Sequence, residues 1–356
     1  MVTRNNIKIY NSLVPMSLVF DIGTKLRNAL YNKQWLSSKS YPLPVICVGN
    51  LAVGGTGKTP HTEYLIDLLQ AQGLHVATLS RGYKRHTKGY LKATPQSAVQ
   101  DIGDEPWQLM QNHPGITVAV DEDRCHGIEQ LMQEQPKTDV ILLDDAFQHR
   151  SVKAGLNILL TDYRRLYTRD MLLPAGRLRE SKNGARRAHI VIVTKCPTNL
   201  SEAEANDIQA ELHLLPHQQL YFSTIAYAKP LAIFDAAPWP QDIDATYTLL
   251  AITGIAHPES MIDYLHSLTP HVEHMSYADH HDFTAKELQQ IQQTFAQLPE
   301  KKLIITTQKD AARLQSLASQ LAPAIQQHLY ALPIQVQFLH QRQTAFNQSI
   351  INYLNR

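Results

Sequence analysis

The chain has 356 residues, of which 44% are hydrophobic and 18% charged, with a formal net charge of +1 at pH 7. This length suffices for one large globular domain or two ordinary ones, and a charge so close to zero argues against a general nucleic-acid-binding protein. The three cysteines and 17 histidines show no spacing typical of a disulfide framework or of a metal-ligand cluster.

The first 38 residues combine an uncharged apolar run with nearby cations. Residues 9–20 carry no charge and are mostly apolar, and lysines and arginines flank them. This composition suits a helix lying in the lipid interface, with its cations near anionic headgroups. A helix packed on the protein's own core fits the same residues, so both interpretations stay open. No apolar run reaches the roughly 20 residues that a membrane span needs.

The segment 44–60, PVICVGNLAVGGTGKTP, predicts a nucleotide-binding loop between a strand and a helix. Glycine-rich backbone can surround a polyphosphate with its N–H groups because glycine tolerates the required dihedral angles. The lysine would contact the β- and γ-phosphates, the threonine hydroxyl would bind Mg²⁺, and the following helix would add the positive end of its dipole. A glycine-rich hairpin turn is the alternative, but the apolar strand before the loop and the amphipathic helix after it favour the phosphate loop. The expected nucleotide-binding residues are Ala52 (where the motif usually has its first glycine), Val53, Gly54, Gly55, Thr56, Gly57, Lys58 and Thr59.

Further apolar runs predict a sheet whose strands alternate with helices. In the first part of the chain, strands are expected at residues 74–80, 116–120, 140–143, 156–160 and 190–193. Such alternation implies an α/β fold with a doubly wound parallel sheet that binds ligands at the carboxyl ends of its strands. A second, smaller α/β domain is expected after this core, with strands at 248–252, 302–306 and 336–339. The predicted parts are an N-terminal segment 1–38, a P-loop core 39–225 and a C-terminal domain 226–356.

Two aspartates, Asp144 and Asp145, follow the predicted strand 140–143. A P-loop enzyme uses such residues to hold Mg²⁺ or its waters. A pair of this kind can also form a turn, but its place downstream of a phosphate loop favours the metal role. The sequence leaves open which of the two contacts the metal. Gln148 and His149 follow closely enough to reach the phosphates or an acceptor.

Three other polar groups are candidates for chemistry. Asp104 and Glu105 precede a predicted helix, where helix capping explains them as well as catalysis does. The sequence Asp-His-His-Asp at 279–282 could serve as general-base machinery or form an ordinary solvated loop. Basic clusters at 81–88 and 164–187 suggest an anionic substrate or a membrane surface. ATP is favoured over GTP because the sequence TKCP, at 194–197, lacks the aspartate of the N-K-x-D motif.

These motifs, in this order, resemble those of the tetraacyldisaccharide 4′-kinases, or lipid A 4′-kinases. The resemblance spans nearly the whole chain and is carried by VGNLAVGGTGKTP, LSRGYKR, GDEP, the DR of DEDR, LDDAFQHR, LPAGRLRE, TKCP, DHH and TTQKD. Ala146, Arg177 and Ser181 depart from the family pattern at peripheral positions. The resemblance implies a phosphotransferase that uses ATP to phosphorylate the 4′-hydroxyl of a tetraacylated glucosamine disaccharide 1-phosphate, which gives lipid IVA in lipopolysaccharide biosynthesis.

The resemblance also implies roles for individual residues. Asp104 would be the base and His280 its partner, with His281 as the alternative partner. Lys58 and Asp145 would complete the catalytic set, and Thr59, Asp144 and Asp145 would serve Mg²⁺. Other active-site positions, assigned to the substrate, match Glu105, Arg124, Gln148, His149, Arg179 and Glu180.

The implied fold has two domains joined by a hinge, and the implied cofactors are ATP and Mg²⁺. The implied location is the cytoplasmic face of the bacterial inner membrane, where the enzyme would be peripheral or monotopic. Its partners would be the glycolipid and the membrane surface, with no nucleic acid and no obligate protein partner. Because the acceptor's acyl chains keep it in the bilayer, the resemblance favours the interfacial interpretation of residues 1–38.

The main alternative is a P-loop ATPase switch of the partitioning or metallochaperone type. Proteins related to the partitioning ATPases usually carry lysine where this chain has Val53. A plain nucleotide-binding module is a third interpretation, but it leaves the GDEP and DHH motifs unexplained.

Overall fold

The chain is described by a computed structural model that covers residues 9–234, 239–255, 258–279 and 281–355. Its contacts divide it into two compact units. Unit 1 comprises the described residues of Met1–Ile225 and Val336–Arg356, and unit 2 those of Ala226–Gln335. Each unit is an α/β structure in its own right.

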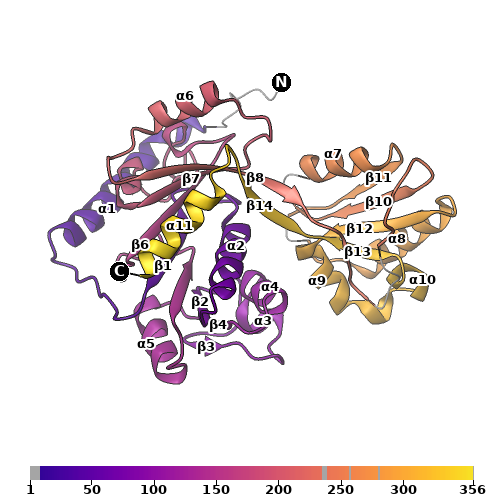
Figure 1. The fold of residues 1–356 in the computed structure, drawn as a ribbon, viewed down its shortest axis with the longest axis horizontal. Helices are drawn as coiled ribbons and strands as arrows, with labels where there is room; N and C mark the ends of the chain where they lie inside the picture. The colour runs from indigo at the N-terminus through magenta and orange to yellow at the C-terminus, as the bar shows by residue number, and fades with distance from the viewer. Residues whose placement is uncertain (1–8, 235–238, 256–257, 280, 356) are drawn as a thin grey trace. The chain divides into compact units, whose positions relative to one another are not determined.

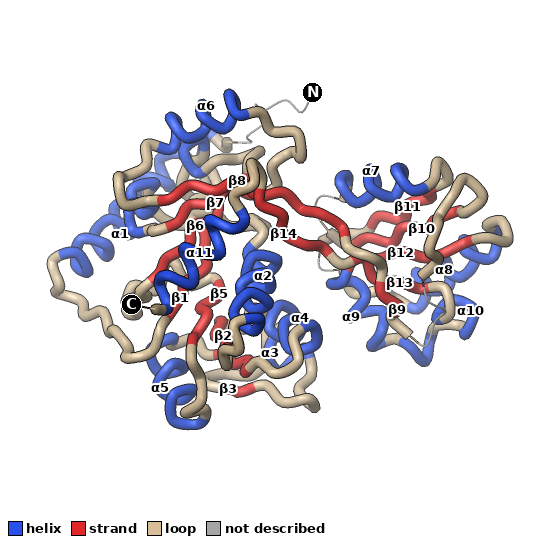
Figure 2. The backbone as a smooth tube through the Cα atoms, viewed as in Figure 1, coloured by secondary structure: helices blue, strands red, loops and turns tan. Residues whose placement is uncertain are grey.

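Unit 1 is built on a nine-stranded sheet with the order β14-β8-β7-β6-β1-β5-β2-β4-β3 (Figures 1 and 2). From β8 to β4 in this order, neighbouring strands pair in parallel, whereas β3 is antiparallel to β4. The doubly wound parallel sheet expected from the sequence is therefore confirmed. The strands are β1 Val45–Asn50, β2 Val76–Ser80, β3 Leu91–Lys92, β4 Thr117–Val120, β5 Val140–Asp144, β6 Leu156–Asp162, β7 Ile190–Thr194, β8 Gln219–Tyr227 and β14 Ile334–Phe338.

Helices cover both faces of this sheet, and β1 shows why. Val45 and Cys47 point into a core with α5 and α6, whereas Ile46 and Val48 point into a core with α2, α4 and α11. A strand buried on both faces needs an unbroken apolar run, which β1 supplies. In Figure 1, α2 and α11 lie on the same face. The helices of unit 1 are α1 Val14–Asn32, α2 Lys58–Ala71, α3 Val99–Ile102, α4 Asp104–Asn112, α5 Arg124–Glu134, α6 Glu202–Leu212 and α11 Gln343–Leu354.

The end of the chain packs differently from the sequence-based expectation. Residues 336–356 were expected in the C-terminal domain, but the structure assigns their described part to unit 1. Val336 and Phe338 of β14 and Phe346 and Ile350 of α11 are buried in the core that also contains α2. The apolar pattern predicted a strand and a helix correctly, but such a pattern does not say which sheet they join.

Unit 2 is a five-stranded sheet with the order β11-β10-β12-β13-β9. Helix α7 packs on one face, and α8 and α9 pack on the other. The predicted strands at 248–252 and 302–306 are present, whereas β11 and β13 were not expected. A hinge between the units stays a prediction. The elements of unit 2 are β9 Leu231–Ala232, β10 Thr248–Thr253, α7 Glu259–Leu268, β11 Val272–Ser276, α8 Ala285–Gln297, β12 Lys302–Thr307, α9 Gln308–Ser316, α10 Pro323–Gln326 and β13 Leu329–Leu332.

Helix α1 presents its polar side to the protein and its apolar side to solvent. Ser17 is buried and donates to the carbonyl of Leu172 at 2.9 Å. In contrast, Val19 and Ile22 are 71% and 67% exposed. This is the reverse of an ordinary surface helix, which buries its apolar stripe. None of the helices that the structure describes is long and apolar enough to cross a bilayer.

Candidate active site

The phosphate loop connects β1 to α2 at the carboxyl edge of the sheet. Gly54 and Gly57 have φ values of 106° and 85°, which side-chain-bearing residues rarely adopt, so glycine is required at both positions. α2 begins directly after Gly57, and its first N–H groups have no partner within the helix. All eight residues expected to bind nucleotide, 52–59, thus lie in one continuous loop and first helical turn.

The loop is tied to the residues around it. The side-chain amide of Asn50, at the end of β1, donates to the hydroxyl of Thr56 at 2.6 Å. The N–H of Val53 donates to the carbonyl of Arg177 at 2.8 Å. Such ties hold the loop in shape before any ligand binds, which lowers the cost of ordering it.

The two aspartates lie beside the phosphate loop because β5 pairs with β1. Asp144 is in register with Val48, near the carboxyl end of β1. Arg179 donates to both carboxylate oxygens of Asp145, with distances of 2.9 Å from Nη1 and 2.5 Å from Nη2. Lys58 Nζ lies 3.8 Å from Asp145 Oδ1. The predicted lysine and Asp145 are therefore brought together.

The two aspartates experience opposite electrostatic environments. Burial and the nearby charge of Glu105 raise the pKa of Asp144 to about 7, and its hydrogen bond from Thr62 is long, at 3.4 Å. Burial also acts on Asp145, but the hydrogen bond from Arg179 and the charge of Lys58 outweigh it and lower the pKa. Asp145 is thus held as a paired carboxylate, whereas the charge of Lys58 only partly offsets the effect of burial on Asp144.

This environment fits Mg²⁺. The ion takes oxygen ligands, keeps several waters, and is usually held by one or two carboxylates together with substrate phosphates. The Thr59 hydroxyl and the Asp144 carboxylate offer oxygens of this kind, and a divalent cation would relieve the charge that raises the pKa of Asp144. Among the described residues there is no cluster of three or more His, Cys, Asp or Glu side chains able to hold a metal. A site completed by phosphate oxygens needs no such cluster.

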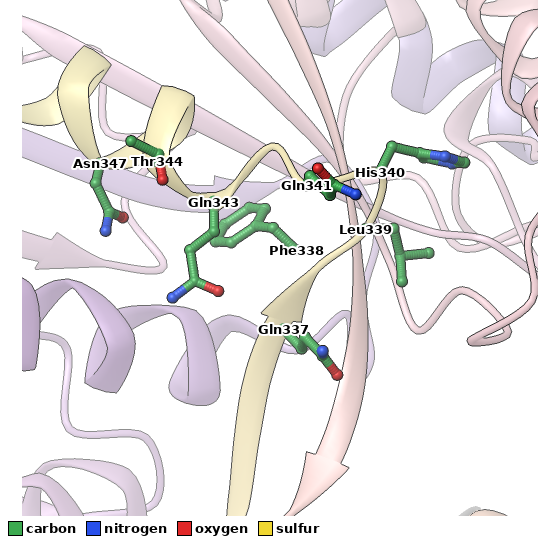
Figure 3. Close-up of a pocket in the computed structure, with 8 residues that line it drawn as sticks. All are labelled: Gln337, Phe338, Leu339, His340, Gln341, Gln343, Thr344 and Asn347. Atoms are coloured by element: carbon green, nitrogen blue, oxygen red, sulfur yellow. The ribbon is translucent and has the colours of Figure 1, made fainter.

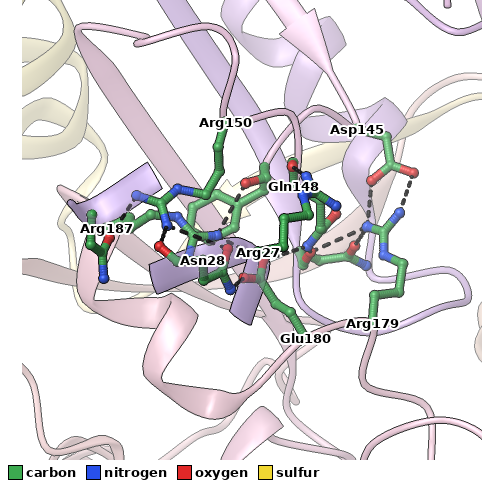
Figure 4. A network of polar contacts seen from close by, with 11 residues as sticks. Arg27, Asn28, Asp145, Gln148, Arg150, Arg179, Glu180 and Arg187 are labelled. Atoms are coloured by element: carbon green, nitrogen blue, oxygen red, sulfur yellow. Dashed lines mark hydrogen bonds and ion pairs between the residues drawn. The ribbon is translucent and has the colours of Figure 1, made fainter. Parts of the chain in front are cut away.

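Glu180 is the centre of a buried polar network that reaches α1 (Figure 4). It is 3% exposed and accepts hydrogen bonds from Asn28 at 3.1 Å, Gln148 at 3.0 Å and Arg187 at 2.7 Å. Arg27 donates to the backbone carbonyl of Gln148. The oxygens of Glu180 are therefore engaged inside the protein, and its structural effect is to hold Gln148 in place.

Arg124 and His149 lie close to the charged side chains at the carboxyl edge of the sheet. Arg124 is 1% exposed, and its charge acts on both Asp144 and Asp145 from the protein interior. Burial and the positive charges of Arg124, Arg27 and Arg81 lower the pKa of His149 to about 4. A neutral imidazole surrounded by guanidinium groups is an environment that favours an anionic ligand.

Asp104 and Glu105 form the first turn of α4. Gly103, with a φ of 93°, is the N-cap, and as a glycine it has no side chain with which to cap the helix. The N-cap position is thus a glycine, and the two carboxylates lie one and two residues further on, in the first turn near the positive end of the helix dipole. The charge of Glu105 acts on Asp144, which links this turn to the aspartate pair.

The Asp-His-His-Asp segment belongs to unit 2, and His280 lies outside the described residues. His281 Nε2 is 3.0 Å from Glu287 Oε2, and its ring stacks on Tyr277 with centroids 4.9 Å apart. The pairing of either histidine with Asp104 stays a prediction.

Several residues of this edge were not expected from the sequence. Asn50 is the last residue of β1 and contacts the loop, so its position just before the motif was an available signal. Thr62 and Asn28 take part through contacts between distant segments, and no local pattern marks them. Arg187 belongs to the basic cluster 164–187, but its bond to Glu180 was not expected.

Three comparisons with known proteins indicate the same family for this chain. Residues 9–355 match the family model described as tetraacyldisaccharide-1-P 4′-kinase. The chain is 50% identical to a tetraacyldisaccharide 4′-kinase of Bacteroides thetaiotaomicron, covering 98% of this chain and 94% of the relative, and 42% identical to one of Porphyromonas gingivalis, covering 98% of each. Its fold is similar to a crystal structure of LpxK from Aquifex aeolicus in complex with ATP, with a TM-score of 0.73 and 30% identity over 96% of this chain and 98% of that one.

Proposed function

The chain belongs to the tetraacyldisaccharide-1-P 4′-kinase family, and from this premise we propose how its residues hold ATP, Mg²⁺ and the glycolipid acceptor. The protein is a kinase of lipid A biosynthesis that phosphorylates the 4′-hydroxyl of tetraacyldisaccharide 1-phosphate, and ATP is its phosphoryl donor. The ATPase-switch alternative is not favoured by this membership.

One observation carries the proposal: the phosphate loop and the aspartate pair lie side by side at the carboxyl ends of β1 and β5. Phosphoryl transfer depends mainly on positioning and on neutralising the charge of the transferring group. Residues 52–59 surround the phosphates, and Lys58 provides the nearest positive charge from the loop itself. Arg179 donates to both carboxylate oxygens of Asp145 and so fixes the orientation of this carboxylate beside the phosphate loop.

Mg²⁺ would be held by the Thr59 hydroxyl and by Asp144, which among the described residues accepts a single long hydrogen bond, from Thr62, whereas Asp145 has ion pairs with Lys58 and Arg179. When bound, the ion neutralises phosphate charge. Asp145, already paired with Arg179, acts through charge and position. The sequence left open which of the two aspartates contacts the metal, and this division of roles is our proposal for it.

Asp104 is the base that takes the proton of the 4′-hydroxyl, and His280 or His281 is its partner. Among the positions assigned to the substrate, His149 and Gln148 are the ones that we expect to contact the ligand. Arg179 and Glu105 lie beside the aspartate pair. Arg124 and Glu180 are 1% and 3% exposed, so they act as positioning residues.

The enzyme works at the cytoplasmic face of the inner membrane as a peripheral or monotopic protein. Support comes from α1, whose apolar residues Met16, Val19 and Ile22 are 60%, 71% and 67% exposed. Burying such side chains in the acyl region of a bilayer is favourable, and the cations of the same segment suit anionic headgroups. The helix therefore brings the site to its lipid acceptor.

The roles of the two aspartates can be separated by the Mg²⁺ requirement of the kinase reaction. Asp144→Asn should raise the Mg²⁺ concentration for half-maximal rate by about 10–100-fold, because a metal contact is lost. Asp145→Asn should lower the rate at saturating Mg²⁺ with a smaller change in that concentration. Thr59→Val removes the other proposed metal contact and should raise the Mg²⁺ requirement as Asp144→Asn does. The reverse pattern, with only Asp145→Asn shifting the requirement, would contradict the assignment.

A further inference from the structure

Carbonyl groups of the phosphate loop are held by side chains from outside the loop. The hydroxyl of Thr194, at the end of β7, donates to the carbonyl of Thr56 at 2.8 Å. The next residue, Lys195, donates from Nζ to the carbonyl of Gly55. Thr194 is fully buried, so water cannot replace its hydroxyl if that group is removed.

His61 of α2 holds the next carbonyl, that of Gly57, from Nδ1 at 2.7 Å. Its Nε2 lies 2.9 Å from the hydroxyl of Ser223 on β8. A carbonyl can only accept, so Nδ1 carries the proton and Nε2 accepts from Ser223. His61 is 3% exposed, and its ring meets the edge of Phe338, a residue visible in Figure 3, with centroids 6.5 Å apart. The imidazole is thus fixed in one orientation and one tautomer.

A held carbonyl fixes the N–H of the same peptide unit, because the trans peptide is planar and the two groups point in opposite directions. The carbonyl of Thr56 therefore sets the direction of the Gly57 N–H, and the carbonyl of Gly57 sets that of the Lys58 N–H. In the part of the chain that the structure describes, neither N–H donates to a protein acceptor. Both stay available to a phosphate group.

We propose that Thr194 and His61 are positioning residues for the kinase reaction, each fixing one phosphate-loop peptide so that the N–H groups of Gly57 and Lys58 face the phosphates of ATP. Lys195 restrains the preceding peptide in the same way. The inference rests on the proposed nucleotide site. A loop whose amides are oriented before binding loses less entropy when the ligand arrives, so these side chains contribute to ATP affinity without touching ATP.

Thr194→Val tests the first contact in the full-length protein, because it removes the hydroxyl and nearly keeps the shape. Binding of radiolabelled ATP with Mg²⁺ should weaken about tenfold, which corresponds to ~1.4 kcal/mol. The KM for ATP should rise by a similar factor with a smaller change in kcat. Thr194→Ser keeps the hydroxyl and should bind ATP nearly as the wild type does.

Thr269→Val is the matched control, since Thr269 is also buried and its hydroxyl donates to the carbonyl of Tyr247 at the same distance, 2.8 Å, in unit 2. It should lower thermal stability much as Thr194→Val does and leave ATP affinity unchanged. Equal loss of ATP affinity in both variants would overturn the inference, because it would show a general effect of destabilisation.

His61 gives a second test that does not depend on how Thr194→Val folds. His61→Leu removes both hydrogen bonds and should weaken ATP binding about tenfold. His61→Gln keeps a donor and an acceptor, so its affinity for ATP should lie between those of His61→Leu and the wild type. Folded Thr194→Val and His61→Leu proteins that bind ATP as tightly as the wild type would overturn this inference alone. A wild-type protein that binds no ATP would overturn the nucleotide site as well.

Discussion

Adjacent aspartates at the end of one strand have opposite electrostatic environments because their neighbours differ. Asp145 is paired with Arg179 and Lys58, whereas Asp144 has the charge of Glu105 nearby and a long hydrogen bond from Thr62. The pKa values of identical side chains one residue apart are therefore driven in opposite directions, and we propose different roles for them on this ground.

Asp104 is the residue that we propose as the base of the reaction. Asp104→Asn should lower kcat by about 10²–10⁴-fold, the usual contribution of a general base. ATP binding should be largely retained, because the residue lies outside the phosphate loop. Steady-state kinetics and direct ATP binding measure the two quantities separately.

The control for this variant is Asp101→Asn, which removes a nearby carboxylate that accepts a hydrogen bond from the N–H of Ala98. It should affect kcat little. Near-normal turnover of Asp104→Asn would remove Asp104 from the mechanism, and a loss of ATP binding would assign it to the nucleotide site.

At the scale of elements, a histidine joins α4 to α2. His113 Nδ1 lies 3.0 Å from Asp67 Oδ1, and Nε2 lies 3.8 Å from Glu63 Oε1. Burial alone would lower the pKa of His113, but the hydrogen bonds and charges of Asp67 and Glu63 outweigh it and raise the pKa to about 9. The contact between the two helices is therefore charged in the folded protein at neutral pH.

The raised pKa predicts a pH dependence of stability. A histidine whose pKa is higher in the folded state stabilises fully below its unfolded value of about 6.5 and loses this contribution as pH rises through about 9. His113→Gln should therefore lower the melting temperature more at pH 6 than at pH 9.5. Thermal unfolding at both values measures this, with His266→Gln, an exposed histidine of α7, as control. A difference between wild type and His113→Gln that does not change with pH would contradict the prediction.

The exposed apolar side of helix α1 is the surface that we expect to contact lipid. Replacing Val19 and Ile22 with Asp should reduce association with vesicles that contain anionic lipid at least about tenfold, because each buried aliphatic side chain contributes roughly 1.5–3 kcal/mol. Gln289→Asp with Gln293→Asp, on an exposed face of α8, adds the same charge elsewhere and should change binding little. Undiminished sedimentation of the α1 variant with vesicles would reject this helix as the lipid contact.

At the scale of the whole molecule, the chain leaves unit 1 along β8 and returns along β14. The last helix of the chain, α11, packs in the same hydrophobic core as α2, the helix that follows the phosphate loop. The stability of the nucleotide site therefore depends on residues more than 250 positions away from it in sequence, since Ile350 and Ile66 share one core.

Phe346 tests this arrangement. It is 1% exposed and stacks on Phe338 with centroids 4.3 Å apart. Phe346→Ala should cost about 3–5 kcal/mol and should speed amide hydrogen exchange in β1 and α2 of unit 1. Gln348→Ala, exposed on the same helix, is the control. Faster exchange confined to β10 and β12 of unit 2 would contradict the assignment of α11 to unit 1.

The sequence predicts those strands and loops that a short run of neighbouring residues is enough to specify. Strands such as β1 and β5 are continuous apolar runs and were expected, whereas β11, VEHMS, is largely exposed and carries no such signal. Likewise, residues 52–59 form one contiguous motif. The contact of Asn28 with Glu180 joins residues 152 positions apart, and only the folded chain brings them together.

We propose that the phosphate loop and the aspartate pair together transfer the γ-phosphoryl group of ATP to the 4′-hydroxyl of the glycolipid. The most direct test incubates purified protein with γ-labelled ATP, Mg²⁺ and tetraacyldisaccharide 1-phosphate in detergent, and follows the label. We predict a doubly phosphorylated lipid that carries the label at the 4′-position, and almost none from Lys58→Met. A folded wild-type protein that consumes ATP without labelling the lipid would contradict the account.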